Sequence, residues 1–168
     1  WDINAIEREV LAPNGIKAEK PRSWPAPEEY DRYAVIYLGE TAPNGVNFEE
    51  SREHLLRYVR EGGVIILSGG AIYNLTGAKR NLKAAADLLG FDSCPKLDST
   101  SCRGVEYGNS IYDWQLGSTT TVSGLAGAEV QARFRSDQAF PAMTVNRIGK
   151  GAVYWIGPML FRVAQQYK

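Results

Sequence analysis

The sequence predicts an α/β fold: a three-layer α/β/α sandwich with a mostly parallel sheet and a C-terminal β-hairpin. The runs Ala34–Leu38 and Val64–Leu67 are apolar throughout, as in strands that are buried on both faces of a parallel sheet. Helix-like and strand-like segments alternate around them, which indicates parallel strands joined by helical crossovers. In the last third, two apolar runs flank Lys150 between Gly149 and Gly151, the pattern of a tight hairpin turn.

Length, composition and charge favour one globular domain over residues 1–168. A chain of 168 residues buries roughly 70% of its unfolded surface. Its 19 basic and 19 acidic residues give no net charge, so we expect no nucleic-acid partner. The apolar run Val64–Leu67 is far shorter than the ~20 residues of a membrane span, so we expect no membrane partner. The start at Trp1 indicates a fragment of a larger chain.

The first half of the chain supplies most of the expected helices and parallel strands. Apolar side chains in 3–11 recur at helical spacing after Asp2, a residue suited to capping a helix. A strand usually precedes the first helix of such a fold, so we expect one upstream of Trp1. Ile16–Glu19 alternates like an edge strand. A helix from Asn47 to the Gly62-Gly63 pair, which ends it, then leads into the second apolar strand.

The second half contains a helix, an irregular region and the closing strands. Lys79–Leu89 has helical periodicity and ends at Gly90. Cys94–Leu125 is rich in Ser, Thr and Gly and predicts an extended loop with one or two short strands. Further segments are expected as three strands and a last helix that packs back on the sheet: Glu129–Phe134, Met143–Val145, Val153–Ile156 and Leu160–Tyr167.

Ser68 is the obvious candidate for a nucleophile, but the sequence gives it no partner. Open α/β sheets bind ligands beyond the carboxyl ends of their strands, and Ser68 follows a predicted central strand. It lacks the G-x-S-x-G frame of a nucleophile elbow. His54 is the single histidine of the chain and falls on the charged stripe of its helix. A Ser-His-Asp triad therefore has no base, and we predict no catalytic residues.

A ligand pocket at the same strand ends is the alternative to a purely structural role. Its candidate residues follow the two central strands and the loops beside them: Glu40, Ser68, Gly69, Gly70, Tyr73 and Trp114. The glycine pair could hold an anion with its backbone N–H groups. It lacks the dinucleotide fingerprint and the Lys-Ser/Thr ending of a phosphate loop, so a tight structural turn is the simpler interpretation.

The two cysteines do not form a metal site. Cys94 and Cys102 are too few for zinc, which normally takes four ligands in paired short spacings. Their separation allows a local disulfide worth about 2 kcal/mol, provided that the compartment is oxidising. We therefore predict no metal and no cofactor.

Aromatic residues outside the periodic core positions have two interpretations. They are Trp24, Tyr73, Tyr107, Tyr112 and Trp114. Such rings in loops stack on sugars or anchor a protein interface. They also form small satellite clusters beneath long loops, the plainer interpretation.

Three blocks of this sequence resemble a known domain family. Tyr30–Leu38, Leu55–Gly70 and Pro141–Gly157 together resemble a class I glutamine-amidotransferase-like domain. They are most similar to its non-catalytic version, which follows the barrel of bacterial β-galactosidases and serves there in trimerisation. The resemblance implies a flavodoxin-like or amidotransferase-like sheet. Active members use a Cys nucleophile at the strand end and a downstream His-Glu pair. Here Ser68 stands at that strand end and no histidine follows His54, which implies the fold without glutaminase chemistry.

These observations lead to one principal hypothesis and two alternatives. The first is a non-catalytic accessory or oligomerisation domain of a larger carbohydrate-active protein, secreted or periplasmic rather than cytoplasmic. Its partners would be other domains of that protein or other copies of itself, with carbohydrate as a further candidate. The second is a small-molecule or sugar-binding module at the strand ends. The third is a hydrolase that uses Ser68 or Glu40.

Overall fold

The computed structural model describes residues 7–19, 25–39, 48–68, 88–92, 96–98, 104–113, 119–122, 124–135 and 139–158. Its helices are η1 (Glu7–Leu11), η2 (Ala12–Asn14), η3 (Pro27–Arg32) and α2 (Phe48–Glu61). The main sheet consists of β1 (Val35–Leu38), β2 (Val64–Ser68), β4 (Val105–Tyr107), β5 (Ser110–Tyr112), β7 (Glu129–Phe134), β8 (Pro141–Ile148) and β9 (Gly151–Ile156). A separate two-stranded sheet pairs β3 (Lys96–Asp98) with β6 (Thr119–Thr121).

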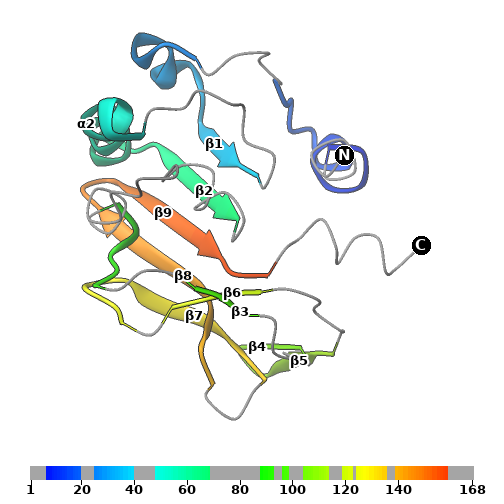
Figure 1. Ribbon diagram of the computed structural model, residues 1–168. Coiled ribbons are helices and arrows are strands. Elements are labelled where there is room, and N and C mark those ends of the chain that lie inside the picture. The colour runs from blue at the N-terminus through cyan, green and yellow to red at the C-terminus, as the bar shows by residue number, and fades with distance from the viewer. Residues whose placement is uncertain are drawn as a thin grey trace.

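The main sheet is mixed, with the strand order β1-β2-β9-β8-β7-β4-β5 (Figure 1). β1, β2 and β9 are mutually parallel. From β9 through β8, β7 and β4 to β5, each neighbouring pair is antiparallel. The α/β class and the C-terminal hairpin are confirmed. The expected mostly parallel sheet is wrong for the described strands, because turns as short as Gly149-Lys150 and Gly108-Asn109 can connect only antiparallel neighbours.

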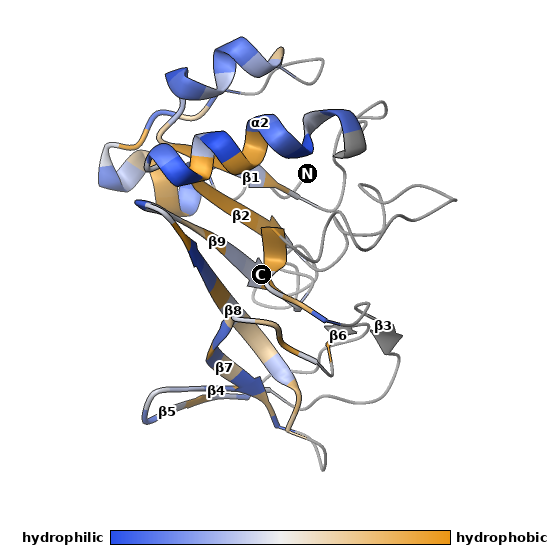
Figure 2. Ribbon diagram, turned by 90° about the vertical axis from the view of Figure 1, so that its left-hand side faces the viewer, coloured by the Kyte–Doolittle hydropathy of each residue, from blue (hydrophilic) through white to orange (hydrophobic). Residues whose placement is uncertain are grey.

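α2 covers one face of the parallel part of the sheet, with its hydrophilic side outward (Figure 2). Leu55 and Val59 of the helix are fully buried in one core cluster with side chains from three neighbouring strands. Those partners are Leu38, Ile65, Leu67, Val153 and Trp155. One helical layer is thus present. The second layer of the predicted sandwich stays a prediction, because Leu160–Tyr167 and most of Lys79–Leu89 lie outside the described residues.

A smaller core lies in the antiparallel part of the sheet. Val105, Ala132, Phe134 and Ala142 are buried together, and Phe140 packs against them. Each half of the sheet therefore buries its own set of apolar side chains.

Two expected segments differ from the structure. Ile16–Glu19 forms no strand; Ile16 is 53% exposed, and its N–H donates to the carbonyl of Leu11 at 2.9 Å in a turn after η2. The alternation of apolar and polar residues in Ile16–Glu19 therefore does not correspond to a buried face of a sheet. The region expected to hold one or two short strands contains four, β3 to β6. Strands of three residues are too short to produce a readable period.

The β8–β9 turn lies directly against the end of α2. The N–H of Lys150 donates to the carbonyl of Arg60 at 3.0 Å. Gly149 has φ +62°, and a Cβ there would lie 2.6 Å from the same carbonyl oxygen. A Cβ on Gly151 would lie 2.2 Å from the carbonyl oxygen of Gly63. These glycines are needed for the close approach of two backbones as well as for the turn.

Tyr58 connects α2 to the parallel strands through a buried hydroxyl. The side chain is 3% exposed and its ring meets that of Tyr30 edge to face, with centroids 6.4 Å apart. The hydroxyl lies 3.0 Å from the carbonyl oxygen of Tyr33 and 3.3 Å from that of Val64, and donates to them. Burial raises the pKa of this phenol above its ordinary value of 10.0.

Replacing Gly149 by alanine is expected to destabilise the fold more than the same change at Gly15. Both glycines are left-handed, with φ +62° and +70°, but a Cβ at Gly15 meets nothing within 4 Å. Gly15→Ala should cost about 1–2 kcal/mol for the backbone conformation, and Gly149→Ala about 1–3 kcal/mol more for the clash with Arg60. Denaturant unfolding measures the difference. Equal losses would contradict the close packing of the turn on α2.

The stability of the fold is expected to fall at alkaline pH through Tyr58. Because its folded pKa is raised, the neutral phenol contributes stability that is complete below pH 10.0 and is lost as pH rises through the folded pKa. The unfolding free energy of the natural chain should therefore decline more steeply above that pH than that of Tyr58→Phe. Denaturant titrations at several pH values measure both slopes, and identical slopes would refute the assignment.

Candidate functional site at the strand ends

Ser68 is the one predicted site residue within the described part of the chain. It is the last residue of β2 and pairs with Ile156 of β9. The other predicted site and cysteine residues lie outside the described residues: Glu40, Gly69, Gly70, Tyr73, Cys94, Cys102 and Trp114. The pocket and the disulfide therefore stay predictions.

The Ser68 hydroxyl is enclosed in the protein. The residue is 0% exposed, and no hydrogen-bond partner of its Oγ is found in the described part of the chain. A nucleophilic serine needs both an adjacent base and access to substrate. In this conformation the described residues provide Ser68 with neither, so its geometry favours a structural role.

The sheet separates Ser68 from the single histidine of the chain. α2, which carries His54, packs on the sheet face formed by Ile65 and Leu67. Successive side chains of a strand point to opposite faces, so the side chain of Ser68 points away from α2. His54 is half-buried on the helix rather than fully exposed. The arrangement agrees with the expectation that this histidine is not a base for Ser68.

Two further buried polar groups were not anticipated from the sequence. Thr144 on β8 and Trp155 on β9 are directly paired, and the described residues supply no hydrogen-bond partner to the Oγ1 of Thr144 or the Nε1 of Trp155. The Trp155 ring packs edge to face on Phe91, with centroids 5.4 Å apart. A polar atom left unpaired in a core costs about 1–3 kcal/mol. Both groups lie within apolar runs, and only the register of β8 against β9 reveals that they meet.

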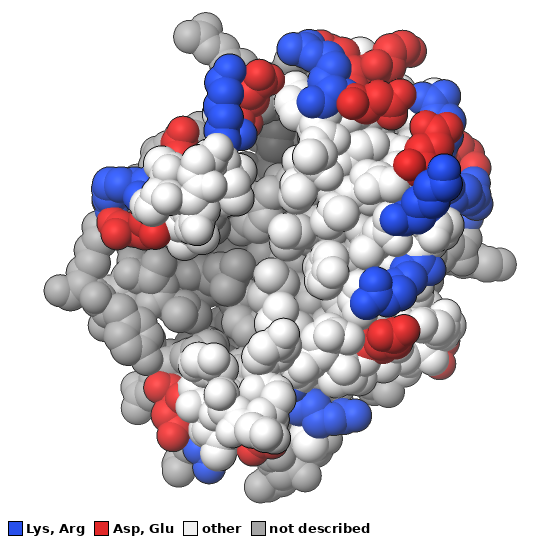
Figure 3. Space-filling model, turned by 180° about the vertical axis from the view of Figure 1, so that it is seen from behind, with Lys and Arg blue, Asp and Glu red and all other residues white. Residues whose placement is uncertain are grey.

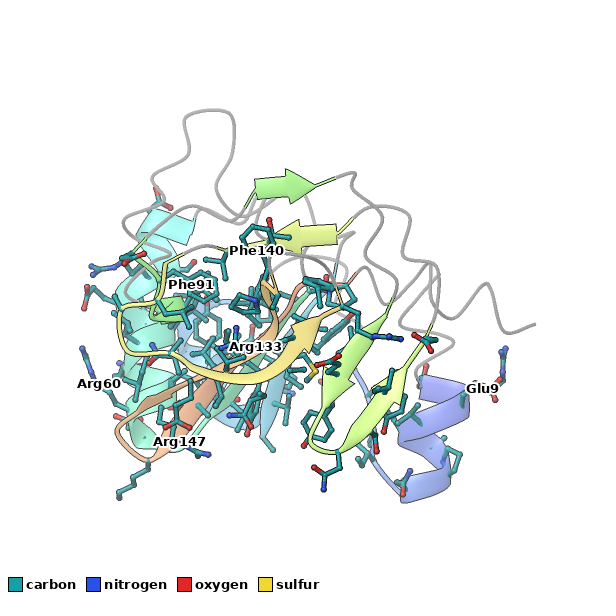
Figure 4. All side chains as sticks on the ribbon, turned by 90° about the horizontal axis from the view of Figure 1, so that it is seen from below. Glu9, Arg60, Phe91, Arg133, Phe140 and Arg147 are labelled. Atoms are coloured by element: carbon teal, nitrogen blue, oxygen red, sulfur yellow. The ribbon has the colours of Figure 1, made fainter. Side chains whose placement is uncertain are left out.

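Many described charged residues lie toward the edge of the face shown in Figure 3. There, coloured Lys, Arg, Asp and Glu residues lie mostly around uncharged described residues. Glu9, Arg60 and Arg147 project from the periphery in Figure 4. Arg8 pairs with Glu9 at 2.7 Å, and both side chains are more than 60% exposed. Exposed pairs of this kind contribute little stability, and they do not form an anion site.

Neither a metal cluster nor a membrane-spanning helix is found among the described residues. In that part of the chain, no three His, Cys, Asp or Glu side chains are grouped so that they could hold a metal ion. Among the same residues, no helix is long and apolar enough to cross a bilayer.

Tyr107 and Tyr112 lie in strands rather than in loops. They belong to the β4–β5 hairpin at the edge of the sheet and are 51% and 47% exposed. The expectation that they are loop residues is corrected, because both take part in a regular antiparallel pairing.

Comparison with solved structures places the fold among parts of larger enzymes. The chain is similar to Gan42B, a GH42 β-galactosidase from G. stearothermophilus, with TM-score 0.59 and 20% identity over 83% of this chain and 22% of the enzyme. It is also similar to the exo-β-1,4-mannosidase Op5Man5 from Opitutaceae bacterium strain TAV5, with TM-score 0.61 and 13% identity over 99% and 28% of the two chains. No protein family and no curated protein matches the sequence.

The same fold also occurs in a shorter protein. The cytoplasmic protein STM1381 from Salmonella typhimurium LT2 has TM-score 0.61 and 14% identity over 90% of this chain and 74% of its own. At these identities the likenesses show the fold alone. The matched region makes up 22% of the β-galactosidase chain and 28% of the mannosidase chain.

Removing the unpaired hydroxyl groups is expected to leave the protein as stable as before or more stable. Thr144→Val keeps the shape of the side chain, and Ser68→Ala removes only the oxygen that lacks a partner. Each variant should raise the unfolding free energy by up to about 1–3 kcal/mol, because the penalty of burying an unpaired oxygen disappears. Thermal and denaturant unfolding measure the change. A loss above about 1 kcal/mol in Ser68→Ala would mean that the hydroxyl has a partner essential to the fold.

Proposed function

We propose that this chain is a non-catalytic accessory domain of a larger glycoside hydrolase, where it contacts other domains or other copies of itself. The proposal rests on the unequal coverage of the two chains in each structural match. The similarity to the β-galactosidase and the mannosidase covers 83% and 99% of this chain but only 22% and 28% of those enzymes. Residues 1–168 would then form one unit beside a separate catalytic region.

The buried site residues support the non-catalytic part of the proposal. Ser68 is enclosed, the described residues place no base beside it, and His54 lies on a helix that covers the opposite face of the sheet. The sequence resemblance to the non-catalytic amidotransferase-like domain of bacterial β-galactosidases supports the assembly part. We include that amidotransferase-like relationship, and the trimerisation role that it implies, in the proposal.

A sugar-binding module is the second candidate, and the unpaired hydroxyl of Ser68 favours it. A buried oxygen without a partner at the carboxyl end of a central strand is a group that a ligand hydroxyl could satisfy. Glu40, Gly69, Gly70, Tyr73 and Trp114 would complete this pocket. Carbohydrate would then be a direct partner of the domain.

Assays of the 168-residue chain on nitrophenyl β-galactoside and β-mannoside are expected to show no turnover above buffer. Calorimetry with galactose, mannose and lactose is expected to show no saturable heat. Turnover that disappears in Ser68→Ala or Glu40→Gln would replace the proposal with a hydrolase. Saturable binding that disappears in Ser68→Trp, with Ser51→Trp as a control for a bulky change at another buried serine, would replace it with the sugar-binding module.

A further inference from the structure

The β4–β5 hairpin exposes apolar side chains on both of its faces at one edge of the sheet. Tyr107 and Tyr112 lie on the face of Val105, because paired residues share a face and side chains alternate along each strand. Ile111 lies on the other face with Glu106, and its side chain is 57% exposed in the folded chain. Figures 1 and 2 show this hairpin at the end of the sheet farthest from β1 and α2.

Within the described part of the chain, β5 has few of the features that usually protect an edge strand. Natural edges are blunted by charged side chains, prolines or bulges, but β5 consists of Ser110, Ile111 and Tyr112 in regular register with β4. Among the described residues, its protection is its length of three residues. An exposed strand of this composition is suited to pairing with another strand.

The turn geometry determines which backbone groups of β5 face outward. Tyr107 and Ser110 are separated by two residues, and Gly108 has φ +57°, as the first central residue of a type II′ turn requires. In such a hairpin the pair that flanks the turn is hydrogen-bonded, and hydrogen-bonded and non-hydrogen-bonded pairs then alternate. The N–H and C=O of Ile111 therefore point away from β4 toward the open edge.

The hairpin is held firmly, and its two carboxylates share one arginine of the same chain. Arg135 forms ion pairs with Asp113 and, at 3.7 Å, with Glu106. The backbone N–H of Arg135 donates to the carbonyl of Gly104 at 3.0 Å. A Cβ on Gly104 would lie 2.4 Å from the carbonyl oxygen of Tyr112, so the two ends of the hairpin are tightly packed. Such a preorganised edge loses little entropy when it binds.

We propose that β5 pairs antiparallel with β5 of a second copy of this chain, about a two-fold axis at Ile111. The proposal rests on the self-association part of the proposed function. A two-fold contact closes with two copies, so it would be a contact additional to the three-fold one that a trimerisation role uses. Two-fold pairing places Ile111 opposite its own copy, with both outward backbone groups exchanged. It places the small Ser110 opposite the large Tyr112, and the amide of Asn109 opposite the carboxylate of Asp113. The strand is complementary to itself, which favours a second copy over an unrelated partner.

Light scattering over a concentration series tests this pairing. The edge is small compared with the roughly 1,000 Å² of a stable interface, so the average mass should rise gradually toward that of a dimer. Ile111→Lys should raise the dissociation constant at least about tenfold, because it sets like charges opposite each other. Ile16→Lys is the matched control, an equally exposed isoleucine elsewhere in the chain, and should associate like the natural chain. Circular dichroism verifies that each variant is folded.

Disulfide trapping provides a second readout. A hydrogen-bonded antiparallel pair has Cα atoms about 5.5 Å apart, within the range that a disulfide spans. In a Cys94→Ser, Cys102→Ser background, Ile111→Cys should yield covalent dimers at least about tenfold faster than Ile16→Cys. Equal rates would overturn the pairing.

The outcomes separate this inference from the proposed function. A natural chain that stays monomeric, or that associates equally well as Ile111→Lys, overturns the β5 pairing. A trimer that is insensitive to Ile111→Lys overturns the pairing but leaves the assembly role intact. Glycoside turnover overturns the accessory role, whatever the mass measurements show.

Discussion

The position of β9 in the sheet is the constraint on which the rest of this structure depends. β9 is parallel to β2 on one side and antiparallel to β8 on the other, so it joins the two kinds of sheet. Its side chains Val153 and Trp155 are almost fully buried against α2 and Phe91. The turn before β9 also contacts the end of α2, through glycines that no larger residue could replace without a backbone shift. A displaced β9 would separate the parallel core from the antiparallel one.

That arrangement divides the molecule into a closed half and an open half. The parallel half, under α2, contains the larger core and the buried Ser68. The antiparallel half ends at β5, where side chains on both faces are exposed. Polar side chains such as Ser68 and Thr144 are buried, whereas β5 at the far edge of the sheet presents exposed side chains.

Sequence reasoning succeeded where segments were long and periodic. α2 and the strands beginning at Val35, Val64 and Glu129 lie where apolar patterning predicted them, because a buried stripe or run leaves a direct trace in the sequence. The short strands β3 to β6 left no such trace. Ile16–Glu19 left a false one, since alternation is only evidence of a strand when a neighbour is available to pair with it. The predicted pocket is mostly outside the described residues, and only Ser68 could be placed.

The sequence by itself determined the α/β class, the main helix, the C-terminal hairpin and the lack of a histidine partner for Ser68. These properties follow from local periodicity, turn residues and composition, which act over short stretches of chain. Only the tertiary structure decided that most described strand pairs are antiparallel, that Ser68 is buried without a described hydrogen-bond partner, and that Ile111 lies on the edge strand of the described sheet. Strand order and register bring together residues that are far apart in the chain. Several strand orders would bury a similar amount of apolar surface, so the apolar pattern of the sequence does not specify which strands become neighbours.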